Sequence, residues 1–90
     1  MIFEFDPNKS AANKVKHGID FVEAQALWTG AVVEGKARTQ DGEVREFAVG
    51  KIGDKLWTVI FTRRGDSGEV IRIISARRSQ PGERRLYGQG

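Results

Sequence analysis

The residues best suited to chemistry in this chain are arginines, and they gather in its last third. Residues 63–90 hold seven arginines against three acidic residues, although the formal net charge of the whole chain is only +3. A guanidinium group is planar, permanently charged and able to bind two phosphate oxygens at once. The clustering favours a polyanionic ligand, and an arginine-rich face that only maintains solubility is the alternative. The arginines concerned are Arg63, Arg64, Arg72, Arg77, Arg78, Arg84 and Arg85.

The remaining residue types exclude most catalytic sites but leave one reaction open. One histidine and no cysteine leave no typical zinc site, and the scattered acids argue against a two-metal nuclease. No phosphate-binding glycine loop, dinucleotide fingerprint or nucleophile elbow occurs. RNA carries its own nucleophile, because its 2′-hydroxyl can attack the neighbouring phosphate once an enzyme orients the strand, moves protons and neutralises charge. Arginine, lysine, histidine, tyrosine and glutamate suffice for that reaction, so we expect no metal or cofactor.

The candidates for proton handling each have an ordinary structural explanation as well. Histidine is the residue type whose ordinary pKa lies near neutrality, yet His17 precedes Gly18 and could simply cap a helix. Lys14 and Lys16 are either solvated helix charges or phosphate contacts. Tyr87 could donate a proton or stack on a base, and it could equally anchor a terminal helix.

The N-terminal elements that must position these residues follow from local signals. Residues 2–5 alternate apolar and charged side chains and predict a short strand. Asp6 and Pro7 predict the start of a helix that runs to His17 and stops at Gly18. A capping-box pattern at residues 20–23 predicts a second helix that continues to residue 28.

The rest of the chain predicts strands and a last helix. Strands are expected over residues 31–38, 44–51, 56–62 and 70–76, joined by turns at 41–42, 53–54 and 65–68. Pro81 favours the start of a final helix. We therefore expect one α+β domain over residues 1–90, with two N-terminal helices after a short strand, an antiparallel meander of about four strands and a C-terminal helix.

Alternation along the fourth predicted strand assigns its side chains to two faces. Ile71 and Ile73 would share one face with Ser75 and Arg77, and the residues of even number would share the other face with Arg72 and Arg78. One face should pack on the helices, while the arginine-bearing face remains available. Trp57, Val59 and Phe61 are the core candidates of the preceding strand.

Composition also predicts the compartment. The chain has no cysteine, no apolar run near the roughly 20 residues that a membrane helix needs, and no secretory signal pattern at its start. These features favour a cytoplasmic protein without a membrane partner.

Several segments occur together in a recognisable order. They are DPNKSAANKVKHGIDF (6–21), Arg45 followed by Gly50, FTRRG (61–65), IRIISARR (71–78) and ERRLY (83–87). This combination resembles the BrnT family of toxins from type II toxin–antitoxin systems over nearly the whole chain. The N-terminal positions that match are Asp6, Lys9, Asn13, Lys16, His17, Gly18, Ile19 and Phe21.

The resemblance implies a RelE-like α+β fold, RNA cleavage that arrests translation, and neutralisation by a BrnA-like antitoxin. Such an antitoxin has a ribbon-helix-helix domain and carries the operator DNA contacts of the complex. Two departures bear on the site. Residues 80–83 read Gln-Pro-Gly-Glu where the family often has Thr-x-x-Glu, which weakens the start of the last helix and the placement of Tyr87. The stretch 65–69 is also slightly longer than in the family, which affects the placement of Arg63 and Arg64.

The hypothesis drawn from the sequence is a metal-independent endoribonuclease whose guanidinium groups gather near the strand ends around a scissile phosphate. A nucleic-acid-binding module without catalysis and an antitoxin-binding subunit of a self-repressing complex are the alternatives. The expected catalytic residues are Arg45, Arg63 and Arg77 for the phosphate and Lys16, His17 and Tyr87 for protons or strand placement. The expected RNA contacts are Lys14, Arg64, Arg78 and Arg84.

Overall fold

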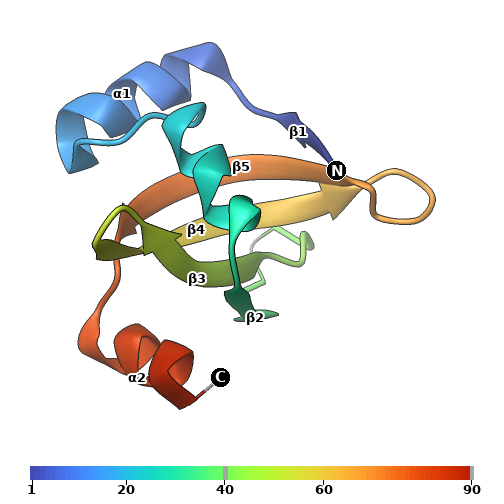
Figure 1. Ribbon diagram of the computed structural model, residues 1–90. Helices are drawn as coiled ribbons and strands as arrows, with labels where there is room; N and C mark the ends of the chain where they lie inside the picture. Colours follow the sequence, from blue (N-terminus) through green and yellow to red (C-terminus); the bar gives the residue numbers. More distant parts are fainter. Residues whose placement is uncertain (40, 90) are drawn as a thin grey trace.

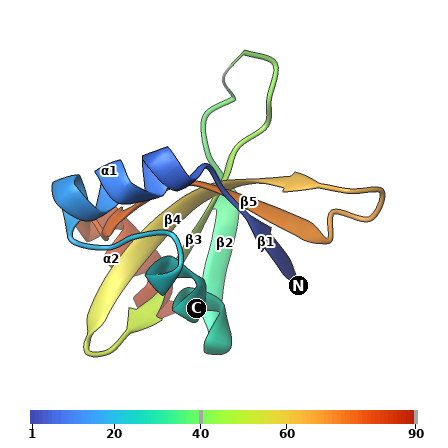
Figure 2. The ribbon, with the colours of Figure 1, turned by 90° about the horizontal axis from the view of Figure 1, so that it is seen from above.

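A five-stranded mixed sheet, in the order β1-β5-β4-β3-β2, organises the chain. The computed structural model describes residues 1–39 and 41–89. The strands are β1 (Ile2–Glu4), β2 (Val32–Lys36), β3 (Glu46–Ile52), β4 (Lys55–Arg64) and β5 (Val70–Arg78). Helix α1 (Pro7–His17) and the 3₁₀ helix η1 (Glu23–Thr29) lie over one face of the sheet, and helix α2 (Pro81–Gln89) lies on the other side (Figures 1 and 2).

Helix α1 begins and ends at the predicted residues. The Asp6 side chain accepts hydrogen bonds from the backbone N–H groups of Asn8 and Lys9, and Pro7 occupies the first helical position. Gly18 adopts a left-handed conformation with a φ of 81° and its N–H donates to the carbonyl of Lys14. Neither α1 nor any other helix in residues 1–39 and 41–89 is long and apolar enough to cross a membrane.

The second N-terminal helix is not an α-helix, which corrects the first part of the fold prediction. The capping box is present, because Asp20 accepts from the N–H of Glu23 while Glu23 accepts from the N–H of Asp20. The seven residues Glu23–Thr29, however, form the 3₁₀ helix η1. The buried residues Ala24 and Leu27 are three positions apart, and a 3₁₀ helix with three residues per turn places both on one side, toward which Phe21 in the preceding turn is also buried.

The sheet is also not a four-stranded antiparallel meander. Strand β1 is part of it and pairs in parallel with β5, with Phe3 opposite Ile71, while the other strand pairs are antiparallel. The parallel pair joins residues almost seventy positions apart, so no local pattern of turns or alternation could reveal it. The predicted strand at residues 2–5 exists, and its place at the sheet edge is the new feature.

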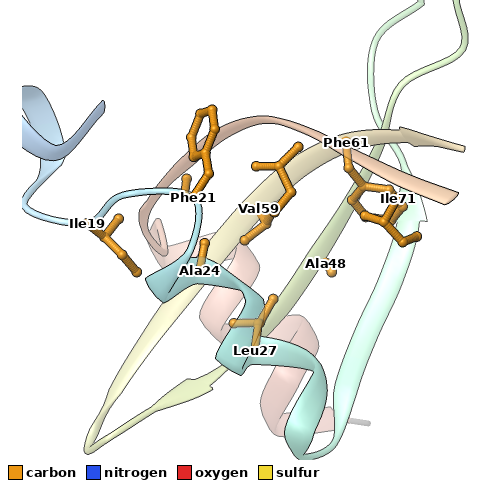
Figure 3. Packing of buried hydrophobic residues seen from close by; sticks show 10 residues of the cluster. Ile19, Phe21, Ala24, Leu27, Ala48, Val59, Phe61 and Ile71 are labelled. Atoms are coloured by element: carbon orange, nitrogen blue, oxygen red, sulfur yellow. The ribbon is translucent and has the colours of Figure 1, made fainter. Parts of the chain in front are cut away.

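The hydrophobic core lies between η1 and one face of the sheet. Ile19, Phe21, Ala24 and Leu27 cover side chains from three strands, including Phe61 (Figure 3). We call this side of the sheet the η1 face, and its buried residues are Ala48, Val59, Phe61, Ile71, Ile73 and Ala76. The opposite side, the α2 face, carries Val49, Thr58, Thr62 and Arg77.

A β-bulge in β5 overturns the predicted alternation. Ile60 pairs with Ser75 and Phe61 pairs with Ile73, so Ile74 is an extra residue with no partner on β4. The core side of β5 therefore consists of Ile71, Ile73 and Ala76 rather than residues of one parity. As a consequence, Arg72 and Arg77 share the α2 face although they are five positions apart, an odd offset that would place them on opposite faces of a regular strand.

Candidate active site

The arginines do not form the single pocket that the sequence predicted. Arg63 lies on the η1 face, where its Nη2 contacts Glu34 Oε1 at 2.6 Å and its Nε contacts Glu46 Oε2 at 3.2 Å. Its guanidinium also lies over the Phe61 ring, with Cζ 5.3 Å from the ring centroid. Two carboxylates therefore engage Nε and Nη2, and a phosphate that approached this edge would have to displace one of them.

Arg64 and Arg72 lie on the α2 face and share one carboxylate. Glu4 Oε1 is 3.4 Å from the Nε of Arg64 and 3.2 Å from the Nη1 of Arg72. Glu43 pairs with the Nη2 of Arg64 at 3.6 Å. Arg72 is thus paired with an acidic residue. Phosphate contact by Arg64 stays a prediction.

Arg77 occupies the best-defined polar centre of the described chain, at the junction of β5 and α2. Its Nη1 and Nη2 donate to Glu83 Oε1 and Oε2 at 2.7 and 2.9 Å. Thr58 Oγ1 and the backbone N–H of Gln80 also donate to Glu83 Oε1, at 3.0 and 2.8 Å. The Thr58 and Ser79 hydroxyls lie 2.8 Å apart, and both residues are buried. We call Arg77, Glu83, Thr58 and Ser79 the Arg77 centre.

The bidentate pair leaves part of the Arg77 guanidinium free. A guanidinium group has five N–H donors, and the two bonds to Glu83 use the edge formed by Nη1 and Nη2. The only further hydrogen bond of this side chain within residues 1–39 and 41–89 is a long one, 3.5 Å from Nη1 to the carbonyl of Arg78. The edge formed by Nε and Nη2 thus keeps two parallel donors, an arrangement that fits two phosphate oxygens.

Glu83 is held in its ionised form. The hydrogen bonds from Arg77 lower the pKa of Glu83 to about 2, and donation by Gln80 and Thr58 acts in the same direction, against the effect of burial. A carboxylate with so low a pKa is a weak base, so Glu83 is poorly suited to accept the 2′-hydroxyl proton at neutral pH. Its geometry is that of a residue that positions Arg77.

Tyr87 and His17 belong to different layers of the fold. Tyr87 lies one turn after Glu83 on α2, on the same side of the helix, and is half-buried. His17 is the last residue of α1 and is also half-buried. It lies one turn beyond Asn13, whose side-chain amide donates to the carbonyl of Ala76 near the end of β5. Lys16 is exposed beside it, whereas Lys14 pairs with Glu23 at 2.8 Å.

Arg45 lies far from the Arg77 centre on the same face. It precedes β3 and continues the alternation of Phe47 and Val49, opposite Thr62 on β4. Thr62 and Thr58 are four residues apart on β4, which corresponds to about 13 Å along the strand. Arg45 forms no ion pair among the described residues, and its Nε and the Thr62 hydroxyl are buried without a hydrogen-bond partner there. A role in catalysis beside Arg77 stays a prediction for Arg45 and for Arg63.

The two predicted RNA contacts nearest to the Arg77 centre occupy its edges. Arg78 lies on the η1 face, with Cζ 5.7 Å from the centroid of the Trp57 ring. Arg84 follows Glu83 on α2, and its Nη1 donates to the carbonyl of Ser79 at 2.7 Å. The structure therefore brings Arg77, Arg78 and Arg84 to one end of the molecule, while Arg45, Arg63 and Arg64 lie toward the other.

Sequence reasoning missed three members of the Arg77 centre, and only one had a signal. Glu83 stands at the third position of a helix whose expected cap is a poor one, and it accepts from the Gln80 N–H as a capping-box glutamate does. That pattern could have marked Glu83 as the residue that fixes the start of α2. Thr58 and Ser79 are ordinary strand-end residues in the sequence, and only the register shows that they meet.

The centre is an open surface rather than an enclosed site. No pocket is found between the residues that the structure describes. Within the same residues, no group of three histidine, cysteine or acidic side chains is placed to hold a metal ion. What the arrangement can do is bind and polarise a phosphate on a strand that lies across the surface.

Comparison with known proteins adds one finding. The family model for the ribonuclease toxin BrnT of type II toxin–antitoxin systems matches residues 5–83, which include strands β2 to β5 and the whole Arg77 centre. No curated protein matches the chain significantly.

Proposed function

Since this chain belongs to the BrnT family of ribonuclease toxins of type II toxin–antitoxin systems, we propose that it cleaves RNA at the Arg77 centre without a metal ion. In the proposed reaction the 2′-oxygen bonds to the adjacent phosphorus and the bond from phosphorus to the 5′-oxygen breaks. The 2′-hydroxyl gives up its proton to a base, and the leaving 5′-oxygen takes one up. The products are a 2′,3′-cyclic phosphate end and a 5′-hydroxyl end.

The observation that carries this proposal is the orientation of the Arg77 guanidinium. Glu83 binds the edge formed by Nη1 and Nη2 and leaves the edge formed by Nε and Nη2 available, as described above. Charge develops on the non-bridging phosphate oxygens as the 2′-oxygen attacks, and two preorganised donors at those oxygens would stabilise the transition state. Arg77 is the catalytic residue of this scheme, and Glu83 and Thr58 are positioning residues.

The carboxylates also favour a reaction without a metal ion. Glu4, Glu34, Glu46 and Glu83 each bind an arginine, so their oxygens are already engaged. In this scheme His17 and Tyr87 are the candidates for proton transfer, and Lys16 is the candidate for placing the strand. Replacing each in turn and following the pH dependence of cleavage assigns the base and the acid.

The partner follows from the family. A type II system has a protein antitoxin. We propose that it is a BrnA-like ribbon-helix-helix protein that also bears the operator DNA contacts, and that RNA cleavage in the cytoplasm arrests translation. The product of the neighbouring reading frame is the molecule to test, because it should bind this chain and relieve the arrest.

Induced expression tests the proposal in cells. Wild-type protein should arrest growth. Arg77→Lys keeps the charge but removes the two-donor edge, so the arrest should be lost while the variant remains folded and antitoxin-bound. Arg72→Lys is the matched control, because it changes an arginine on the same face that lies outside the centre, and it should arrest growth fully. Arrest by Arg77→Lys at the wild-type rate, or its equal loss in Arg72→Lys, would refute the assignment.

A further inference from the structure

Among the described residues, ten lysines and arginines form no ion pair, and six of them gather at one end of the molecule, while Lys9, Lys36, Arg38 and Arg45 lie elsewhere. We call this surface the free-cation end, and its residues are Lys16, Lys51, Lys55, Arg78, Arg84 and Arg85. None of them has a carboxylate within 4.0 Å among residues 1–39 and 41–89, in contrast to Arg63, Arg64, Arg72 and Arg77. Asp54 at the tip of the β3–β4 turn is the acid next to Lys55 in the chain, and the end keeps a clear positive excess.

Three segments distant in the sequence make up this end. Lys51 and Lys55 flank the β3–β4 hairpin, and Trp57 on the same hairpin pairs with Arg78 at the end of β5. Helix α2 begins soon after β5 and carries Arg84 and Arg85. The C-terminal end of α1, the hairpin and the start of α2 lie on the same side of the molecule in both views (Figures 1 and 2).

The opposite end of the sheet is nearly neutral despite its arginines. Glu4, Glu34, Glu43 and Glu46 pair there with Arg63 and its neighbours in the strands. The modest net charge of the chain therefore hides a strong asymmetry. A flexible polyanion would therefore meet the strongest attractive potential at the free-cation end.

An aromatic side chain interrupts the positive charges. The Arg78 guanidinium lies over the half-buried Trp57 ring, with the 5.7 Å separation given above. A guanidinium plane supported by an indole is a surface on which an unpaired base can stack, and duplexes do not offer such a base. Cations around an aromatic platform are typical of surfaces that bind single strands rather than acidic proteins.

We propose that the free-cation end binds single-stranded RNA and guides it to the Arg77 centre, with the Arg78–Trp57 pair as a base-stacking platform. The inference rests on the proposed function for the destination of the strand. Arg77 and Arg78 are consecutive residues on opposite faces of β5, so a strand stacked on Arg78 passes the end of the sheet next to Arg77. The paired arginines at the far end take no part in binding.

Fluorescence anisotropy of a labelled 2′-O-methyl RNA strand tests the location of binding, because that strand binds but cannot react through its 2′-oxygen. The double variant Lys51→Gln/Lys55→Gln should bind about tenfold more weakly at 0.1 M salt and lower the salt slope by about 0.7 per lysine. The matched double variant Lys9→Gln/Lys36→Gln removes the same charge from exposed lysines elsewhere and should bind like wild type.

The stacking platform needs its own variant. Arg78→Lys keeps the charge and loses the planar group, so the preference for single strands over a duplex of the same sequence should fall several-fold while the salt slope stays unchanged. An unchanged preference would refute the platform. Circular dichroism and the melting temperature establish that each variant is folded.

The remaining outcomes separate this inference from the proposed function. Equal weakening by the two double variants would overturn it, because binding would then follow net charge alone. The inference would also be overturned if Lys51→Gln/Lys55→Gln bound RNA as tightly as wild type and lost affinity only for the antitoxin. The surface would then belong to the protein partner. Binding at this end with ordinary RNA left intact would refute cleavage and leave the inference standing.

Discussion

The Arg77–Glu83 pair makes a prediction about stability that is independent of catalysis. Replacing Glu83 by glutamine removes the charge that holds Arg77 and accepts from Thr58 and Gln80. The pKa of Glu83 is lowered from 4.5 to about 2, and about 2.5 units correspond to about 3 kcal/mol. The Glu83 and Arg77 side chains keep 19% and 26% of their exposure, so solvent screens the interaction between them. We therefore expect Glu83→Gln to lower the free energy of unfolding by about 2 kcal/mol.

The pH dependence of this stabilisation follows from the direction in which the pKa of Glu83 is shifted. A carboxyl group with a lowered pKa stabilises the folded state fully above its unfolded value, near 4.5, and this contribution is lost as the pH falls toward about 2. Wild type should therefore exceed Glu83→Gln in free energy of unfolding by about 2 kcal/mol at pH 7. The difference should shrink steadily between pH 4.5 and pH 2.

Urea denaturation at a series of pH values measures this difference. Asp54→Asn, a carboxylate-to-amide change at an exposed turn, corrects for the altered net charge of the variant. A gap between wild type and Glu83→Gln that persists unchanged below pH 3, or that is absent at pH 7, would refute the ion-pair account of the Arg77 centre.

Three further substitutions test the fold that carries the site. Asn13→Leu removes buried side-chain bonds to Ala76 and should cost about 2–4 kcal/mol in urea denaturation, and a cost below 1 kcal/mol would contradict this role. Gly50→Ala places a methyl group about 3.0 Å from Leu27 Cγ and should destabilise the fold by about 1–2 kcal/mol, which lowers the melting temperature. An unchanged or raised melting temperature would show that η1 shifts to accommodate the methyl group. Gly18→Ala forces alanine into the left-handed region and should lower the free energy of unfolding by about 1 kcal/mol in urea denaturation. An unchanged free energy would show that the end of α1 is frayed.

Local signals in the sequence predicted local structure well. The Asp6 cap, the Gly18 stop and the Asp20–Glu23 capping box all occur as expected, because each depends on residues within a few positions of one another. The strands at residues 55–64 and 70–78 and the turns between them were also visible as apolar runs bounded by glycines.

What the sequence concealed depends on residues far apart in the chain. The parallel place of β1 and the bulge at Ile74 are properties of pairing, and the bulge alone exchanges the predicted faces of Arg77 and Arg78. The prediction of a common arginine pocket was wrong for a similar reason. Glu34 is 29 positions from Arg63, so no spacing rule shows that it neutralises that arginine.

The candidate site was only partly visible for the same reason. Arg77 stood out by its residue type, but its availability is decided by which guanidinium edge Glu83 occupies. That choice depends on the start of α2 and on Thr58 from a neighbouring strand. Predicting the site therefore required the register of the sheet as well as the composition of its strands.

Cleavage of RNA by antitoxin-free protein in excess chelator, with the new ends analysed by mass spectrometry, tests the central claim most directly. The account predicts 2′,3′-cyclic phosphate and 5′-hydroxyl ends from the wild-type protein and none above background from folded Arg77→Lys. Intact RNA in chelator with cleavage restored by a divalent cation, or equal cleavage by Arg77→Lys, would contradict it.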